Sequence, residues 1–189
     1  FMSNCTEVTS PFIVKREVKK VAVVVFASNT SLCGGFNANV IRHLVDLLAE
    51  YKPLGLENIL VFPVGKKVAD AVRKLGFRIE GDFQHMADKP SYQEAADLAA
   101  DLMKRFLHGD VDKVELLYNH FKSTASQILT RETYLPIDLN NEKKEEERTI
   151  DYILEPSAEE LMQEMLPKVL RMKMFTVLLD SNAAEHAAR

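Results

Sequence analysis

Residues 21–37 have the sequence VAVVVFASNTSLCGGFN, in which a strand pattern, a loop and the start of a helix follow one another. Val21–Phe26 is a short continuous apolar run rich in β-branched residues, typical of a strand buried on both faces of a parallel sheet. From Phe36 onward, apolar residues recur at helical spacing as far as Tyr51, and glycine and proline follow. The segment therefore predicts a strand–loop–helix unit.

The same alternation continues along the chain. Ser91 and Glu94 have the Ser-x-x-Glu spacing of a capping box, which predicts the start of a helix that ends at Gly109. A shorter helix is predicted at 67–75, and further strands are predicted at 59–62, 77–83, 114–118 and 126–136. Strands that alternate with helices specify an α/β fold. We expect a Rossmann-like, open and mostly parallel sheet of about five strands, with flanking helices and a long C-terminal helix.

The last third of the chain changes in character. Residues 140–148 contain no apolar side chain and predict a solvated loop or mobile linker, and 150–154 form a short extended piece. Ser157 and Glu160 give a second capping box before the longest helical pattern, which Pro167 is expected to kink or divide. A continuous helix from residue 158 to 189 would span about 48 Å. We expect such a helix to leave its domain and to need a partner.

These boundaries predict three parts: a lead-in at 1–20, an α/β domain at 21–157 and a C-terminal helix at 158–189. The chain has 189 residues and a formal net charge of −4, with both signs interspersed. This distribution argues against a nucleic-acid binder and against a polybasic membrane anchor. No apolar run approaches the roughly 20 residues of a membrane-spanning helix, so any membrane contact is expected to come through a partner. Two cysteines, Cys5 and Cys33, suggest a reduced compartment.

The strongest enzymatic candidate is the loop at 28–37. It lies at the carboxyl end of a strand and before a helix, where an anion is favoured, and its hydroxyl groups could surround a phosphate. Cys33 could act as a nucleophile. However, neither the Gly-x-Gly-x-x-Gly pattern nor a P-loop pattern is present, and no neighbouring residue provides a base for Cys33. A flavodoxin-like or nucleotide-binding domain that uses this loop remains the alternative hypothesis.

Other candidate sites are weaker. The five histidines show no metal-ligand spacing, and Asp110-Val111-Asp112 lacks the rest of a calcium loop, so it is interpreted as a turn before a strand. The methionines at 162, 165, 172 and 174 suit either an adaptable groove or a packed helix core. The residues alone therefore predict no catalytic residue, no metal and no cofactor.

Several ordered blocks resemble the gamma subunit of F-type ATP synthases. Residues 28–37 resemble the motif Ser-Asp-Arg-Gly-Leu-Cys-Gly-Gly-Phe-Asn, and 112–121 resemble Asp-x-Val-x-Leu-Ile-Tyr-Asn-x-Phe. Residues 152–161 resemble Tyr-Ile-Phe-Glu-Pro-Ser-x-Glu-Glu-Leu, and 178–189 resemble a Glu-His-Ala-Ala-Arg-ending block. The matching positions that the resemblance marks as possible partner contacts are Ser28, Leu32, Cys33, Gly34, Gly35, Phe36, Asn37, Glu185 and Arg189. Asn29-Thr30-Ser31 departs from the family's Asp-Arg-Gly, so no charged contact is transferred to those positions.

The resemblance implies a non-catalytic rotor subunit. Gamma subunits have N- and C-terminal helices wound into a shaft inside a ring of alpha and beta subunits, above a domain that contacts the epsilon subunit and the c-ring. Proton flow through the c-ring turns the shaft, and catalysis takes place in the beta subunits. The resemblance also implies a peripheral location on the cytoplasmic face of the bacterial inner membrane. Most of both shaft helices are expected to be missing from a chain of this extent.

Overall fold

The computed structural model describes residues 10–31, 34–138 and 158–189, and these form a five-stranded sheet with the order β3-β2-β1-β4-β5. The strands are β1 (Val21–Phe26), β2 (Ile59–Val64), β3 (Arg78–Ile79), β4 (Lys113–Ser123) and β5 (Ser126–Leu135). Strands β1 to β4 are parallel, and β5 is antiparallel to β4. The tight turn between β4 and β5 forces the antiparallel pairing, because a parallel connection needs a crossover. The predicted α/β fold with a mostly parallel sheet is confirmed.

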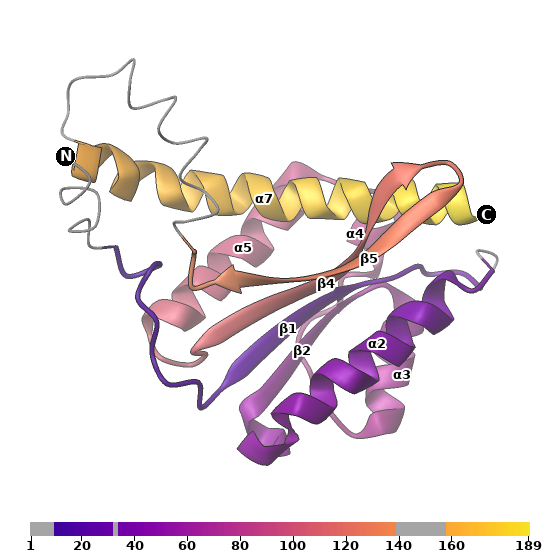
Figure 1. Cartoon of the computed structure of the whole chain (residues 1–189), viewed down its shortest axis with the longest axis horizontal. Coiled ribbons are helices and arrows are strands. Elements are labelled where there is room, and N and C mark those ends of the chain that lie inside the picture. The colour runs from indigo at the N-terminus through magenta and orange to yellow at the C-terminus, as the bar shows by residue number, and fades with distance from the viewer. Residues whose placement is uncertain (1–9, 32–33, 139–157) are drawn as a thin grey trace.

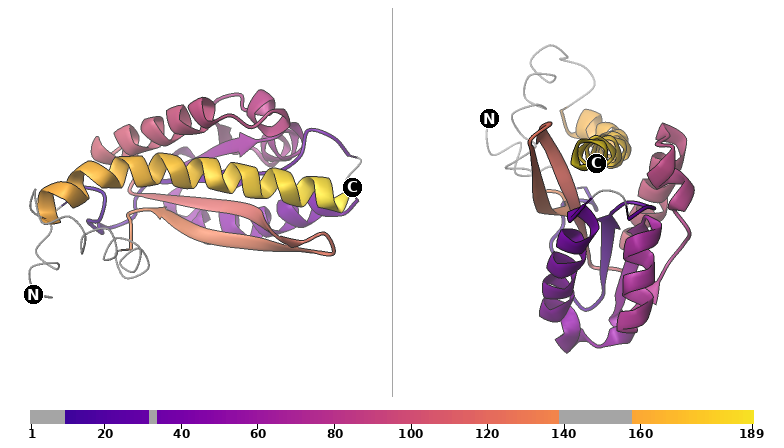
Figure 2. Two further views of the ribbon diagram at one scale, coloured as in Figure 1. Left: turned by 90° about the horizontal axis from the view of Figure 1, so that it is seen from above. Right: turned by 90° about the vertical axis from the view of Figure 1, so that its right-hand side faces the viewer.

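Helices cover both faces of the sheet (Figures 1 and 2). The helices are α2 (Phe36–Tyr51), α3 (Lys66–Leu75), α4 (Gln84–Asp88), α5 (Tyr92–Leu107) and α7 (Ala158–Ala188), and the two short 3₁₀ turns are Lys52–Leu54 and Leu56–Asn58. Alternate side chains of β1 point to opposite faces. Val21, Val23 and Val25 pack with α2 and α3, whereas Ala22, Val24 and Phe26 pack with α5 and α7. The unbroken apolar sequence of β1 thus serves two cores.

The third strand differs from its prediction at residues 77–83. Only Arg78 and Ile79 pair with β2, and the amide of Glu80 adds one bond to the carbonyl of Val61 at 2.9 Å. Gly81 then adopts φ +76°, which turns the chain out of the extended conformation. The five-residue α4 follows this turn, and the sequence analysis missed it because so short a helix has no apolar period.

The expectation that the C-terminal helix leaves its domain was wrong, and of the two outcomes expected at Pro167, a division of the helix does not occur. Helix α7 is one continuous helix with Pro167 inside it, so the proline does not divide it. Buried Leu166 and Leu170 anchor the turns around the proline, which compensates for the backbone hydrogen bond that proline cannot make. Nor does the described helix leave the domain, because the residues of one of its faces remain buried as far as Ala184 and Glu185. It lies along α5 and β4 for most of its length (Figure 2).

Two further sequence predictions concern helix and turn geometry. The helix start predicted at Ser91 is confirmed, because the Ser91 hydroxyl oxygen caps α5 by accepting from the Glu94 amide at 3.2 Å. Asp112, in the predicted turn before β4, holds the lead-in segment, because it accepts from Arg16 Nε at 2.8 Å and from the amides of Lys19 and Lys20. The predictions for 140–148, 150–154 and Ser157 lie outside the described residues. None of the helices in the described part combines the length and hydropathy needed to cross a bilayer.

Candidate functional site

The loop after β1 is held by its own polar side chains. The Ser28 amide donates to Asn37 Oδ1 at 2.9 Å, and Asn37 Nδ2 donates to the Thr30 carbonyl at 2.8 Å. The Ser28 hydroxyl donates to the same carbonyl and accepts from the Thr30 amide, each at 2.8 Å. Ser28 is fully buried and Asn37 almost fully. The motif residues at the two ends of the loop therefore bind one another.

Asn29 joins this loop to two neighbouring segments. Its Oδ1 accepts from the Lys66 amide at the start of α3, and its Nδ2 donates to the Gln84 carbonyl at the start of α4, each at 2.8 Å. Both functions of the carboxamide are used, and an ionised aspartate could not supply the second. The departure from the family's Asp-Arg-Gly therefore has a physical consequence, because Asn29 fixes three segments with one uncharged side chain.

Close backbone packing brings the loops after β1 and β2 together. Gly65 has φ +127°, and a Cβ there would lie 2.5 Å from the Ala27 carbonyl oxygen. The Lys67 amide donates to the Ser28 carbonyl at 3.2 Å. Only glycine permits both this conformation and this contact. The hydroxyl group of Ser28, proposed as a phosphate ligand in the alternative hypothesis, is thus engaged inside a closed set of loops. Leu32 and Cys33 lie outside the described residues, so their predicted roles stay predictions.

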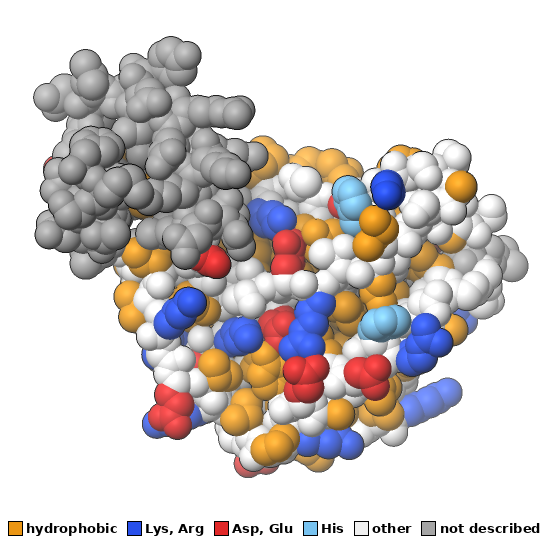
Figure 3. Space-filling view, in the orientation of Figure 1, with side chains coloured by type: hydrophobic (Ala, Val, Ile, Leu, Met, Phe, Trp, Pro, Cys, Tyr) orange, Lys and Arg blue, Asp and Glu red, His pale blue; other side chains and the backbone are white. Residues whose placement is uncertain are grey.

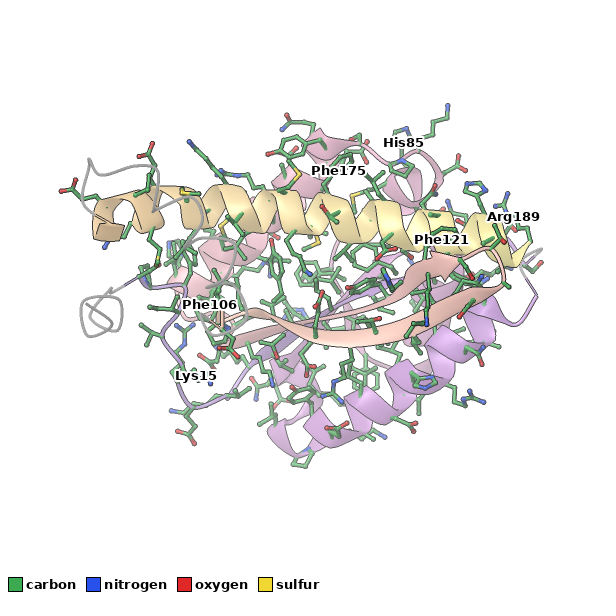
Figure 4. All side chains as sticks on the ribbon, turned by 45° about the horizontal axis from the view of Figure 1, so that its top comes forward. Lys15, His85, Phe106, Phe121, Phe175 and Arg189 are labelled. Carbon is green, nitrogen blue, oxygen red and sulfur yellow. The ribbon has the colours of Figure 1, made fainter. Side chains whose placement is uncertain are left out.

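The structure brings the first and last motifs of the chain together. Phe36, at the start of α2, packs with Ala184 and Ala188 near the end of α7 and with Phe121 of β4. Gly34 has φ +60°, and a Cβ on it would lie 4.0 Å from the Ala188 carbonyl oxygen. In Figure 4, Phe121 and Arg189 lie at the same end of the molecule. Gly34 and Gly35 therefore lead the chain into α2 beside the last turn of α7.

Polar contacts fix the last turns of α7 at this end. Asp180 accepts from the Phe121 amide at 2.7 Å and lies 2.6 Å from His120 Nδ1. Glu185 is buried, with 5% of its surface exposed, and accepts from Arg189 Nη2 at 2.9 Å. Of the sequence-predicted positions, all except the two undescribed ones gather around this junction of the β1 loop, the β4–β5 hairpin and α7. We call this region the motif junction.

An ion pair on the face of the sheet that α2 covers was not predicted, and the buried carboxylate of Glu115 is its centre. Arg131 of β5 donates from Nε and Nη2 to the buried carboxylate of Glu115 at 2.7 and 3.0 Å, and from Nη1 to Glu50 of α2 at 2.6 Å. Burial raises the pKa of Glu115, but hydrogen bonds from Arg131 and Tyr51 outweigh burial and hold it below its usual range. Burial and the neighbouring Glu115 raise the pKa of Tyr51. The signal that could have indicated a partner is Glu115 itself, a charged residue inside the apolar run of β4.

Helix α7 has an apolar face in addition to the one buried on the domain. Met174 is fully buried, whereas Met172 is 53% exposed and Leu179 is 45% exposed. Six partly or fully exposed positions of α7 follow one another at alternating intervals of four and three residues. They are Met165, Val169, Met172, Thr176, Leu179 and Ala183. That is the spacing of a coiled-coil seam. We call these six positions the outer seam. The front face in Figure 3 shows apolar side chains beside interspersed charges.

The motif junction is built from apolar packing and internal hydrogen bonds. No group of three or more His, Cys, Asp or Glu side chains in the described ranges is placed to hold a metal ion. The polar groups of the motif junction bond to one another, and the outer seam is apolar at five of its six positions. Both features suit contact with other protein segments.

Comparison with known proteins places these motifs in context. The protein-family model described as ATP synthase matches residues 1–189. A relative from Phocaeicola vulgatus, named ATP synthase gamma chain, is 76% identical over the whole of this chain, which covers 66% of that relative. One from Bacteroides thetaiotaomicron, with the same name, is 54% identical over the whole chain and 67% of its own length. The chain thus spans about two thirds of the length of the curated relatives it matches.

Solved structures share the fold at lower identity. A chain of the central stalk and c-ring structure of Tetrahymena thermophila mitochondrial ATP synthase aligns with a TM-score of 0.64 at 22% identity, over 93% of this chain and 75% of its own length. A chain of the Euglena gracilis mitochondrial ATP synthase rotor aligns with a TM-score of 0.57 at 19% identity, over 90% and 64% of the two chains. At these identities the likeness concerns the fold.

Proposed function

Because this chain belongs to the ATP synthase gamma-chain family, we propose that it forms the base of the central rotor and transmits rotation without catalysing a reaction itself. In this role, proton-driven rotation of a c-ring is coupled through the chain to ATP synthesis in a ring of alpha and beta chains. The proposed location is peripheral, on the cytoplasmic face of the bacterial inner membrane.

The outer seam of α7 is the observation that carries this proposal. The inner face of the helix is already buried on α5 and β4, yet the outer face repeats apolar residues at coiled-coil spacing. Exposed apolar surface of this kind favours association with another helix. A shaft of two wound helices, which the family resemblance implies, would cover this seam with a second helix of the gamma chain.

The motif junction supports the proposed role in a second way, because it would let the domain pass its rotation on to α7. It fixes the end of α7 to the sheet through Asp180, Phe36 and the β1 loop. A helix that bears a load needs such an anchorage, because a rotation of the domain must become a rotation of the helix. We propose that the motif junction faces the alpha and beta chains, and that Leu32 and Cys33, which belong to the same sequence motif, contact a partner. We propose the epsilon chain and the c-ring as the remaining partners.

The proposal is tested with the full-length gamma chain assembled with its alpha, beta and epsilon chains. The double variant Met172→Asp/Leu179→Asp places two charges in the outer seam. Val45→Asp/Ile128→Asp is the matched control, because those side chains are 40% and 44% exposed elsewhere on the surface. Recovery of gamma in the assembled complex and ATP-driven proton pumping are measured for both.

We expect the seam variant to lose gamma from the complex or to reduce proton pumping at least tenfold, with the control within twofold of wild type. Full assembly and normal pumping with the seam variant would contradict the proposal. The nucleotide-binding alternative makes a separate prediction. Thermal stabilisation by FMN, NAD or ATP that Ser28→Ala removes would favour it over a purely mechanical role.

A further inference from the structure

Polar contacts between α7 and the β4–β5 hairpin follow one stripe of the helix. Figure 2 shows α7 lying between this hairpin and α5. Lys173 Nζ lies 2.9 Å from Glu132 Oε1 of β5. Seven residues later, Asp180 accepts from the Phe121 amide of β4 at 2.7 Å. About two turns of helix, or about 10 Å, therefore separate two side-chain contacts with the same hairpin.

The carboxylate of Glu132 is itself held by the sheet. The Tyr118 hydroxyl donates to the same Glu132 oxygen at 3.0 Å. Tyr118 is buried, and its ring packs edge-to-face against Phe26 of β1 with 6.4 Å between the ring centroids. Lys173 of α7 thus pairs with a carboxylate whose position is fixed from the centre of the sheet. We call the contact of Lys173, Glu132 and Tyr118 the Glu132 bridge.

The contact between α7 and α5 is of a different kind. Leu102 of α5 belongs to the same buried core cluster as Leu170 and Met174 of α7. Apolar attraction has no preferred direction, whereas an ion pair or hydrogen bond requires defined distances and angles. In helical assemblies, a polar contact set among apolar ones selects one register. The Glu132 bridge is placed to select one rotational position of α7 in the same way.

The exposure of the Glu132 bridge separates this role from a role in folding. The side chains of Lys173 and Glu132 are 39% and 32% exposed, and ion pairs that water reaches add little to the free energy of unfolding. One turn earlier on the stripe, the Leu170 carbonyl accepts from the buried Tyr134 hydroxyl at 2.5 Å. That acceptor is a backbone atom, so side-chain substitutions on α7 can remove the contact at Lys173 and leave the one at Leu170 in place.

We propose that the Glu132 bridge fixes the rotational position of α7 on the domain, so that Lys173, Glu132 and Tyr118 are positioning residues for the transmission of rotation. The inference rests on the proposed function, in which a rotation of the domain must become a rotation of the helix. Asp180 holds one end of the stripe. With the Glu132 bridge as a second point of attachment, the helix between the two contacts cannot twist against the sheet without breaking a polar contact.

The experiment measures the torsional stiffness of the rotor in the complex of full-length gamma chain with alpha and beta chains. The ring of alpha and beta chains is held on a surface, and a bead is attached to the domain through an azide-bearing amino acid in place of the exposed Val45 of α2. The angular variance of the bead is recorded while rotation is arrested. This variance is inversely proportional to the stiffness of the path between the bead and the ring.

Three variants isolate the Glu132 bridge. Lys173→Glu places two carboxylates face to face, and Glu132→Lys/Lys173→Glu restores a pair of opposite charges with its direction reversed. Lys168→Glu is the matched control, because it makes the same change in net charge and breaks an exposed pair with Glu164 that lies wholly within α7. Thermal unfolding of each isolated chain measures stability. Lys173→Met, which removes the charge without introducing repulsion, replaces Lys173→Glu if that variant does not fold.

We expect Lys173→Glu to raise the angular variance about twofold or more, with a thermal midpoint close to that of wild type. The reversed pair should return the variance toward the wild-type value, and Lys168→Glu should leave it unchanged. Wild-type variance in both Lys173→Glu and Lys173→Met would overturn the proposal. An equal increase in Lys168→Glu would do the same, because it would show a general effect of charge on α7.

Failure of this inference is distinguishable from failure of the proposed function. If the complex with wild-type gamma chain does not rotate the bead when ATP is supplied, the proposed function fails. If it rotates the bead, and the angular variance does not depend on the charges at Glu132 and Lys173, only the role of the Glu132 bridge is wrong.

Discussion

Met172 and Met174 lie two residues apart on α7, yet Met174 is fully buried and Met172 is 53% exposed. Met174 belongs to the face that packs on α5 and β4, and Met172 belongs to the outer seam. The same residue type therefore serves two surfaces of one helix. Apolar content alone therefore does not reveal which contacts a helix makes within its own domain.

The largest expected effect comes from breaking the inner face. Met174→Ala should lower the free energy of unfolding of the 189-residue chain by about 2–5 kcal/mol, because it removes buried contacts and leaves a cavity. Met172→Ala is the matched control and should change it by less than about 0.5 kcal/mol. Urea denaturation measures both. Equal losses for the two variants would show that the faces do not differ as described.

The second test measures how much the ion pair between Glu115 and Arg131 stabilises the fold, apart from apolar packing. Glu115→Gln should lower the free energy of unfolding by about 2 kcal/mol at pH 7, because it removes the charged partner of Arg131 from a buried site. Glu50→Gln is the control, since Glu50 contacts the same arginine but is 59% exposed. Its cost should stay below about 1 kcal/mol.

The pH dependence of this effect has a definite sign. The pKa of Glu115 is lowered in the folded state, so its ionised form adds stability above the unfolded-state pKa, near 4.3. That contribution is lost as the pH falls through the folded-state pKa. Denaturation curves from pH 7 downward should therefore converge for wild type and Glu115→Gln. The stability lost in Met174→Ala should persist at low pH. A difference in stability between wild type and Glu115→Gln that widens in acid would contradict the stabilising role of the ionised Glu115.

A smaller effect on stability is expected at Asp180, where α7 contacts the β4–β5 hairpin. Asp180→Ala removes the acceptor of the Phe121 amide and the partner of His120, and should cost about 1–2 kcal/mol. Faster amide hydrogen exchange at Phe121 would locate the loss at the β4–β5 hairpin. Unchanged exchange there would show that Asp180 does not hold the hairpin to α7.

The smallest effect is expected for the outer seam in the isolated chain. Met172→Asp/Leu179→Asp should change the free energy of unfolding by less than about 0.5 kcal/mol, since neither side chain is buried in the domain. A loss above about 2 kcal/mol in thermal or urea unfolding would mean that the seam supports the domain itself.

The sequence predicted the regular part of this fold well. The apolar run of β1 and the capping box of α5 act through local chemistry, so they can be recognised from a few residues. The contacts of the motif junction could not be derived, because Phe36 and Ala184 meet only through the tertiary fold. The motif resemblance selected these positions without indicating that they touch.

The route of α7 was also beyond sequence reasoning. Its length suggested that it leaves the domain, whereas its inner face follows α5 and β4 as far as Glu185. A helix with two apolar faces shows a weak overall periodicity, and the pattern does not reveal which face meets the domain. Burial of Met174 beside exposure of Met172 settles that question within the described residues.

The most direct test is the oxidation of methionine by peroxide, followed by mass spectrometry, in the isolated 189-residue chain and in the full-length gamma chain of the assembled complex. In the isolated chain, Met172 should oxidise rapidly and Met174 slowly, in keeping with their exposure. Assembly is expected to protect Met172, so that its oxidation rate falls close to that of Met174. Oxidation of Met172 at the same rate in both states would show that the outer seam is not covered, and would contradict the proposed rotor role of α7.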